Sequence, residues 1–255
     1  MSSRDEQDKE KLFHFKQFSL SDSGCAMKIG TDGVILGAFA AKFADINQPH
    51  SILDIGTGCG LIALMTAQKS VGVIHAIDTD KKAVETASRN FCNSPWADRL
   101  KVFYASLQEF GFSSHDKYNM IVCNPPYFQN SLKSPDMARN LARHNQELSF
   151  EDLFLHSARL LSNDGRLLVI YPVENMDLVK SQSAKQGFAE AGRLWISPDA
   201  GAPPKRIISE FCLSGCSGTE TEYLHIETGV RHNFSEAYRQ LTFDYHPFFN
   251  NDSQL

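Results

Sequence analysis

The feature that most constrains the fold is a regular alternation of short apolar runs and helix-like stretches, which starts at Ser51 and continues to Tyr171. The apolar runs predict strands at Ile52 to Ile55, Val73 to Ile77, Leu100 to Tyr104, Tyr118 to Cys123 and Arg166 to Tyr171. The stretches between them predict helices at Leu61 to Lys69, Lys81 to Cys92 and Phe150 to Leu161. Strands and helices in this rhythm form right-handed crossovers, so the pattern predicts an α/β fold with a mainly parallel sheet and helices on both faces.

The chain after Tyr171 continues as a helix and then becomes rich in β-structure. The helix is predicted at about Val173 to Gly187. Three strand-like segments follow, at Arg193 to Ile196, Ile207 to Leu213 and Glu222 to Ile226. Because no long linker interrupts the sequence, we expect one domain over residues 51–255, preceded by a tail and a capping arm over residues 1–50.

Composition indicates an ordinary globular protein with a sizeable core, since 42% of the 255 residues are hydrophobic and 22% are charged. No apolar run approaches a membrane-spanning length and Met1 to Glu10 is too polar for a signal peptide, so we expect a cytoplasmic protein without a membrane partner. The six cysteines are scattered, which favours structural thiols over disulfides and predicts no metal site. The net charge of −5 argues against nucleic-acid binding over the whole surface, but it is compatible with a local basic patch.

A glycine-rich turn follows the first predicted strand. Asp54 leads into Gly56-Thr57-Gly58-Cys59-Gly60, and a helix starts at Leu61. Glycines at alternate positions permit a tight turn and let backbone amides approach a ligand that any Cβ would block. The spacing differs from GxGxxG, which would require a glycine in place of Leu61. The second strand ends at Asp78, whose carboxylate can accept both hydroxyls of a ribose, whereas Asp80 is expected to cap the next helix; together these features favour an adenosine cofactor.

A rigid corner, Asn124-Pro125-Pro126-Tyr127, ends the fourth predicted strand. Prolines cannot donate ladder hydrogen bonds and fix their own backbone angle, so the strand must end there. Taken alone, the corner can be only a strand-terminating turn. In a parallel sheet whose first strand binds a cofactor, however, the fourth strand is its neighbour across the switch point, which makes the corner a candidate substrate site.

The glycine loop and the acid after the second strand resemble class I S-adenosylmethionine-dependent methyltransferases, over roughly Ser51 to Tyr171. The resemblance implies a single Rossmann-like domain with a seven-stranded, mainly parallel sheet and a C-terminal antiparallel strand. It implies that the methionine part of the cofactor is surrounded by Asp54, Gly56, Thr57, Gly58 and Gly60. Asp78 would hold the ribose. Many members carry an acid after the third strand that accepts from the cofactor adenine; here Ser106 or backbone amides must substitute.

The proline corner resembles the (N/D/S)-P-P-(Y/F/W) motif of amino-methyltransferases, which binds a planar exocyclic amine. Such an amine is a poor nucleophile because its lone pair is delocalised into the ring. The Asn124 side-chain oxygen and the Pro125 carbonyl can each accept one amine hydrogen and align the lone pair with the sulfonium methyl. Pro126 belongs to the substrate side of the corner, and Tyr127 would stack on the base, a contact worth about 1–3 kcal/mol. No general base need precede attack.

Segments beyond the glycine loop resemble the bacterial enzymes that methylate the adenine amine beside the anticodon of a valine tRNA. These segments are Phe15-Lys16-Gln17-Phe18 with Met27 to Ala38, Leu141-Ala142-Arg143-His144, and Ala202-Pro203-Pro204-Lys205-Arg206. The resemblance covers Phe15 to about Leu213 and implies a tRNA substrate. It also implies that Thr31 and Asp32 lie close to the cofactor, although capping of the following helix would by itself explain both residues. We expect a monomer.

Basic side chains gather in the long connection after the corner and in the late Pro-Pro turn. Candidate contacts to tRNA phosphates are Arg139, Arg143, His144, Lys205 and Arg206. A solvated loop would explain the first three equally well.

Two other functions fit parts of the pattern. Protein glutamine methyltransferases that act on release factors share the proline corner, but they usually carry a helical substrate domain before the glycine loop, where this chain has only about fifty residues. A cofactor-binding module without catalysis is disfavoured, because Asn124 and the glycine loop are both intact. The sequence leaves open which tRNA and which adenine are modified.

Overall fold

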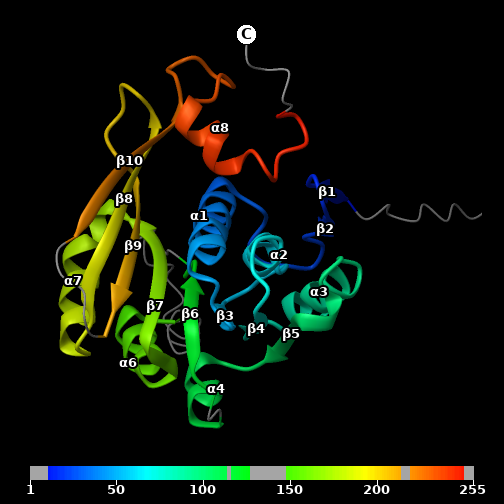
Figure 1. The fold of residues 1–255 in the computed structure, drawn as a ribbon, viewed down its shortest axis with the longest axis vertical. Helices are drawn as coiled ribbons and strands as arrows, with labels where there is room; N and C mark the ends of the chain where they lie inside the picture. Colours follow the sequence, from blue (N-terminus) through cyan, green and yellow to red (C-terminus); the bar gives the residue numbers. More distant parts are fainter. Residues whose placement is uncertain (1–10, 114–115, 127–147, 214–218, 250–255) are drawn as a thin grey trace, which may run out of the picture.

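The computed structural model describes residues 11–113, 116–126, 148–213 and 219–249. Its centre is an eight-stranded sheet with the order β10-β8-β9-β7-β6-β3-β4-β5 (Figure 1). The strands are β3 (Ser51–Ile55), β4 (Val73–Asp78), β5 (Leu100–Tyr104), β6 (Tyr118–Cys123), β7 (Leu161–Pro172), β8 (Ala189–Asp199), β9 (Arg206–Cys212) and β10 (Glu220–Glu227). A two-stranded hairpin of β1 (Leu12–His14) and β2 (Ser19–Ser21) precedes the sheet.

All strands of the large sheet run in one direction except β9. This strand is antiparallel to both of its neighbours, β7 and β8, whereas the other strand pairs are parallel. The predicted α/β fold with a mainly parallel sheet is therefore confirmed, and it includes one antiparallel strand. That strand is β9, whereas the C-terminal strand β10 is parallel to β8 and raises the number of strands from the predicted seven to eight. The first four residues of β10 are exposed, so its sequence lacks the buried run that marks a central strand.

Helices cover both faces of the sheet, because consecutive strand residues point to opposite sides. Ile52 of β3 belongs to the core formed with α1 (Thr31–Asn47), α2 (Leu61–Ala67) and α3 (Lys81–Cys92). The next residue, Leu53, belongs to the core formed with α4 (Leu107–Ser113), α6 (Phe150–Leu160) and α7 (Met176–Lys185). The other helices of the described residues are η1 (Ala97–Arg99), η2 (Val173–Asn175) and α8 (Glu236–Thr242), and α8 packs on α1 and β10.

The predicted elements match the structure to different degrees. The helix Lys81–Cys92 and the strands Leu100–Tyr104 and Tyr118–Cys123 have the predicted bounds. The helix predicted at Val173 to Gly187 starts with the 3-10 turn η2 and becomes α-helical only at Met176.

A buried asparagine holds the N-terminal segment on the rest of the molecule. Asn90 of α3 is 5% exposed; it accepts from the Ser21 amide at 3.0 Å and donates to the carbonyls of Ser21 at 2.8 Å and Cys59 at 2.7 Å. Phe18 stacks on Phe15 in the same region, with 4.7 Å between the ring centroids. Residues before Ser51 therefore share a core with the main domain, and the division of the chain at that point stays a prediction.

The cysteines only partly follow the sequence expectation. Cys25, Cys59, Cys92 and Cys123 are free thiols, but Cys212 is disulfide-bonded, which corrects the prediction for this residue. Among the described residues, no helix has the length and apolar character of a membrane span, and no His, Cys, Asp and Glu side chains gather in groups that could hold a metal ion.

We expect Asn90→Ala to lower the free energy of unfolding by about 2–4 kcal/mol, because three buried backbone groups lose their hydrogen-bond partner. Chemical denaturation measures this loss. Asn119→Ala is the control: Asn119 accepts from the His50 and Ser51 amides at 3.2 Å and is half-buried, so water can replace part of its role. Equal losses in the two variants would contradict the anchoring role of Asn90.

Candidate active site

The candidate site lies where three neighbouring strands end. β3 pairs in register with β4 on one side and with β6 on the other, so Ile55 lies beside both Ile77 and Cys123. The glycine loop, Asp78 and Asn124 therefore meet at one edge of the sheet. The chain crosses to opposite sides of β3 at this point, which is the switch point where parallel α/β sheets bind ligands.

The glycine loop is built on three glycines with positive φ. The angle is +69° at Gly56, +57° at Gly58 and +86° at Gly60, a region that L side chains rarely adopt. A Cβ at Gly60 would stand 2.5 Å from the Phe91 ring, so packing requires this glycine. A Cβ at Gly56 or Gly58 would meet no described atom within 4 Å. These two glycines form a cradle of open space in which a ligand can approach the backbone.

Asp54 is a fully buried carboxyl beneath this loop. Its Oδ2 accepts a 2.6 Å hydrogen bond from the Thr57 hydroxyl, whereas its Oδ1 is buried without a hydrogen-bond partner in the described part of the chain. Burial raises the pKa of Asp54 to about 7, against the opposing effects of hydrogen bonds from the Thr57 hydroxyl and the Ala63 backbone amide. A buried acceptor without a donor is unfavourable, so Oδ1 marks a place for a donor or a positive charge from a ligand.

Asp78 ends β4 and shapes the glycine loop from the other side. Its Oδ2 accepts from the Gly58 amide at 2.8 Å and its Oδ1 accepts from the Asp80 amide at 2.8 Å. Each oxygen keeps a second lone pair, so both can still accept from ribose hydroxyls. Burial raises the pKa of Asp78, and hydrogen bonds from the two amides oppose this shift. Asp80 caps α3 as predicted, because its side chain accepts from the Lys82 amide.

Asn124 follows β6 directly and lies near the start of α1. Its side chain is half-buried, Pro125 is buried and Pro126 is exposed. A Cβ at Gly33 would stand 4.0 Å from Asn124 Nδ2 and 3.2 Å from Leu61 Cδ2. The first turn of α1 thus packs between the corner after β6 and the residue that opens α2. Tyr127 lies outside the described residues, so its stacking on a base stays a prediction.

The expected capping of α1 is wrong. Gly30 occupies the N-cap position, and no side chain of the described residues makes a capping hydrogen bond there. Thr31 and Asp32 already belong to the first turn, so they do not precede its free amides as a cap must. Asp32 instead pairs with Arg206, with 2.7 Å between Oδ2 and Nε. The predicted contacts of Thr31 and Asp32 with a cofactor stay predictions.

Ser106 has a local structural role that the sequence expectation did not include. Its hydroxyl donates to Glu109 Oε2 at 2.8 Å and accepts from the Glu109 amide at 3.2 Å, while its own amide donates to the same carboxylate at 3.0 Å. This is a capping box at the start of α4. The hydroxyl is therefore engaged, and the role of Ser106 at the cofactor adenine stays a prediction.

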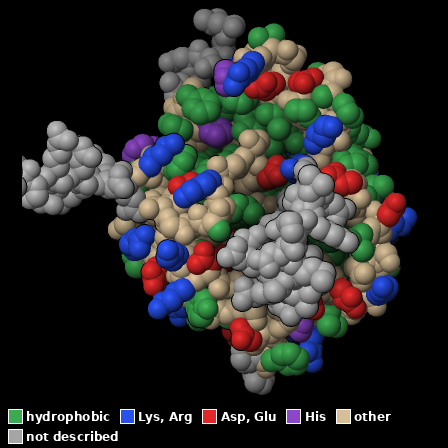
Figure 2. All heavy atoms as spheres, turned by 180° about the vertical axis from the view of Figure 1, so that it is seen from behind, with side chains coloured by type: hydrophobic (Ala, Val, Ile, Leu, Met, Phe, Trp, Pro, Cys, Tyr) green, Lys and Arg blue, Asp and Glu red, His purple; other side chains and the backbone are tan. Residues whose placement is uncertain are grey.

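The predicted substrate contacts are described only in part. Lys205 is exposed and Arg206 is half-buried, both at the start of β9. Outside the described residues lie Arg139, Arg143 and His144. Figure 2 shows Lys and Arg side chains interspersed with Asp and Glu over one face of the molecule, which agrees with a net charge of −5.

Sequence reasoning missed two residues that shape the site. Asn90 donates to the Cys59 carbonyl and so braces the glycine loop from α3. Gly33 permits the close approach of α1 to Leu61 and Asn124. A signal for Gly33 was present, because glycine within a helix lowers its stability and usually has a packing reason.

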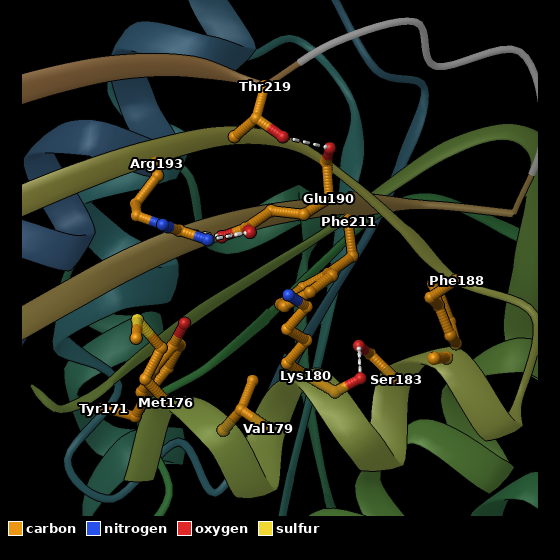
Figure 3. A pocket seen from close by; sticks show the side chains of 11 residues that line it. Tyr171, Met176, Val179, Lys180, Ser183, Phe188, Glu190, Arg193, Phe211 and Thr219 are labelled. Atoms are coloured by element: carbon orange, nitrogen blue, oxygen red, sulfur yellow. Dashed lines mark hydrogen bonds and ion pairs between the residues drawn. The ribbon is translucent and has the colours of Figure 1, made fainter. Parts of the chain in front are cut away.

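A cavity of about 300 Å³ lies elsewhere, between α7 and the strands β8 and β9 (Figure 3). The Tyr171 hydroxyl lies 2.7 Å from the Ser209 hydroxyl, which donates to Glu190 at 2.6 Å. Glu190 also pairs with Arg193. These polar groups satisfy one another, and the cavity includes none of the predicted site residues, so we assign it no part in the chemistry.

Comparison with known proteins identifies the family. Residues 34–191, more than half of the chain, match the methyltransferase small domain model. The chain belongs to this family. Curated relatives of nearly equal length carry the name tRNA1(Val) (adenine(37)-N6)-methyltransferase: one from Parabacteroides distasonis is 39% identical over 92% of this chain and 97% of its own. Another, from Flavobacterium psychrophilum, is 42% identical over 91% of this chain and 97% of its own.

Solved structures of other methyltransferases share the fold. A predicted O-methyltransferase from Agrobacterium tumefaciens superposes with a TM-score of 0.64 at 16% identity, over 87% of this chain and all of its own. A putative RNA methyltransferase from Pyrococcus horikoshii gives a TM-score of 0.51 at 17% identity, over 69% of this chain and 79% of its own. At these identities the likeness shows the fold alone, and it agrees with the methyltransferase small domain assignment.

We expect Gly58→Ala to weaken binding of S-adenosylmethionine by about tenfold or more, because the added methyl occupies the open cradle of the loop. Isothermal titration calorimetry measures the affinity. Gly187→Ala is a matched control, since Gly187 has a φ of +79° and no described atom within 4 Å of a Cβ, so it suffers the same backbone strain away from the site. Unchanged affinity in Gly58→Ala would show that the cradle holds no ligand.

Cofactor affinity should increase as pH rises through about 7, the pKa of buried Asp54. Below this pH the carboxyl is protonated; above it the carboxylate attracts a cationic ligand, so binding at lower pH must release a proton. Its titratable neighbours are Asp78 and the Cys123 thiol, which stays protonated because burial raises its pKa well above the ordinary value. Asp54→Asn should flatten the pH profile of affinity, and an unaltered profile would exclude Asp54 as its source.

Proposed function

We propose that this protein transfers the methyl group of S-adenosylmethionine to the exocyclic amine of an adenine in tRNA. The observation that carries the proposal is the placement of the Asn124 corner beside the glycine loop, at the ends of the paired strands β6 and β3. The names of the relatives support the finer assignment to adenine 37 of tRNA1(Val). A match over 97% of the length of these relatives supports carrying over the whole activity.

The residues after β3 and β4 fit S-adenosylmethionine. The open cradle at Gly56 and Gly58 admits the ligand to the loop backbone, and Asp78 offers carboxylate lone pairs to ribose hydroxyls. The unpartnered Oδ1 of Asp54 suits the ammonium group at the methionine end. When bound, this cofactor supplies a methyl group that is open to nucleophilic attack because it is attached to a positively charged sulfur.

Asn124 and Pro125 orient the amine that accepts the methyl group. The Asn124 amide oxygen and the Pro125 carbonyl each accept one amine hydrogen, which directs the nitrogen lone pair toward the cofactor side of the site. Both acceptors also stabilise the positive charge that develops on nitrogen. The two prolines fix the backbone of this corner, so little reorganisation is needed on substrate binding. After the attack, the methylated nitrogen is an acidic ammonium that loses its proton. No general base therefore has to remove a proton before the attack.

The substrate and setting follow from the same assignment. An adenine in tRNA must leave its stack to reach the corner after β6, and Tyr127, Pro126 and basic side chains near the corner receive it and the adjoining phosphates. We place the reaction in the cytoplasm and the enzyme as a monomer, with an arm over residues 1–50 and the catalytic domain over residues 51–255. Size-exclusion chromatography with light scattering tests the monomer.

Two substitutions should separate chemistry from cofactor binding. Asn124→Ala should reduce kcat for methyl transfer by at least about a hundredfold while S-adenosylmethionine affinity stays within a few-fold, because the amine loses an acceptor that acts at the reacting atom. Asp78→Ala should weaken cofactor affinity first, because the ribose loses its carboxylate. Single-turnover methylation and calorimetry provide the two readouts. Near-normal methyl transfer by Asn124→Ala would overturn the proposed mechanism.

Methyl incorporation into bulk tRNA, compared with incorporation into release factor, tests the substrate class. We expect radiolabel from the cofactor in tRNA, and nucleoside analysis of tRNA from a strain lacking the protein should show the loss of one N6-methyladenosine. Labelling of release factor alone would favour glutamine methylation instead.

A further inference from the structure

We propose that Asp32 and Arg206 form a positioning pair, which holds the first turn of α1 against Asn124 and thereby sets the alignment of the amine with the cofactor loop. The inference rests on the proposed function, because it concerns the same methyl transfer. It gives both residues a role toward each other, in place of separate contacts to cofactor and tRNA.

Arg206 is a fixed anchor, because the backbone around it is hydrogen-bonded on two sides. In the β9 ladders it lies beside Pro172 of β7 and Ile196 of β8. The preceding residue, Lys205, donates its amide to the Ile196 carbonyl at 2.8 Å and accepts from the Val173 amide at 3.2 Å. The start of β9 is thus tied to both neighbouring strands, and a side chain attached there has a well-defined origin.

The start of α1 needs such an anchor. Its N-cap is Gly30, without a capping side chain from the described residues, and this glycine is exposed. The charge-assisted contact between Asp32 Oδ2 and Arg206 Nε, at 2.7 Å, connects this first turn to a strand 174 residues away in sequence. Both side chains are about 30% exposed, so the pair is partly shielded from solvent. Arg206 is further oriented by a 3.1 Å bond from Nη1 to the Lys205 carbonyl.

The residue after Asp32 packs between the two parts of the site. Gly33 is buried, and the space that its side chain would fill lies 3.2 Å from Leu61 Cδ2 and 4.0 Å from Asn124 Nδ2. Leu61 opens α2 directly after the glycine loop. The first turn of α1 therefore fills the gap between the cofactor loop and the amine-binding corner, and any shift of Asp32 changes what surrounds both. Misplacement of reacting groups by about 1 Å can reduce a rate by about a hundredfold.

Charge pairing also argues against separate ligand roles. If Arg206 left Asp32 to bind a phosphate, or if Asp32 left Arg206 to bind a ligand, the 2.7 Å contact between guanidinium and carboxylate would be lost. Either departure would give up a charge-assisted hydrogen bond that is already formed within the protein. Separate ligand roles for the two residues therefore compete with their mutual contact.

A double-mutant cycle on methyl transfer to tRNA tests the pair. We expect Asp32→Ala and Arg206→Ala each to lower kcat by about tenfold or more, with KM for tRNA and cofactor affinity changed by less than about threefold. The double variant should be no slower than the slower single variant, because the second substitution removes a side chain whose ion-pair partner is already absent. The charge-swapped variant, Asp32→Arg with Arg206→Asp, should recover part of kcat.

The ion pair between Arg166 and Glu210 provides a matched control. It also joins β9 to another element, with 2.8 Å between Nε and Oε1 and comparable shielding, but it lies at the other end of the strand. Arg166→Ala and Glu210→Ala should lower thermal stability to a similar degree and leave kcat unchanged. If they lowered kcat as much as Arg206→Ala does, loss of stability alone would explain the effect and the positioning role would fail.

Other outcomes contradict the pair in distinct ways. Additive losses in the double variant would show that the two residues act independently. A raised KM for tRNA and a shallower salt dependence in Arg206→Ala, with normal kcat, would make Arg206 a phosphate contact. Weaker cofactor binding confined to Asp32→Ala would make Asp32 a cofactor ligand. If the unaltered protein methylated release factor but not tRNA, the proposed function would fail first, and the cycle could be repeated on that substrate.

Discussion

The in-register parallel pairing of β3 with β4 and β6 is the constraint on which the rest of the structure depends. It places Ile55, Ile77 and Cys123 at one level, so that the loops after the three strands meet at one edge. The register is fixed by the core, since Ile52 and Leu53 are both fully buried on opposite faces of the sheet. A slip by one residue would send each side chain into the wrong core. Hydrophobic packing and the geometry of the site are therefore set by the same strand pairings.

The unfavourable contribution of the site to folding comes from its two acids, Asp54 and Asp78. Asp54 is buried with one oxygen unpartnered, and Asp78 is largely withdrawn from solvent, so burial raises the pKa of both carboxyls. Neither arrangement improves folding, because a buried carboxyl is disfavoured in its charged form. Both become favourable when a ligand brings a positive charge or hydroxyl donors. A binding site that is preorganised in this way is unfavourable until its ligand is bound. The cores on both faces of the sheet provide the stability that offsets this unfavourable contribution.

Sequence patterns predicted what depends on local periodicity and on burial from both sides. The central strands, the helix Lys81–Cys92, the glycine loop and the cap at Asp80 were all accessible in this way. The start of α1 was not, because Thr31 and Asp32 have capping side chains but lie one and two residues too late. The partner of Asp32 is 174 residues distant, and no local rule could identify it. β10 was recognisable as β-rich, but its place beside β8 depends on the edge that the sheet leaves open.

The antiparallel strand and the N-terminal arm form part of the scaffold of the site. The family match covers residues 34–191, and both members of the Asp32–Arg206 pair lie outside it. The shared family core supplies the glycine loop, Asp78 and Asn124, whereas the first turn of α1 depends on the flanking segments for its anchor. Because no side chain of the described residues caps α1, the contact between Asp32 and Arg206 ties its first turn to β9, which couples the last part of the sheet to the residues that meet the amine. Segments that flank the shared core can in this way change the position of the catalytic corner without a change in the residues of the corner itself.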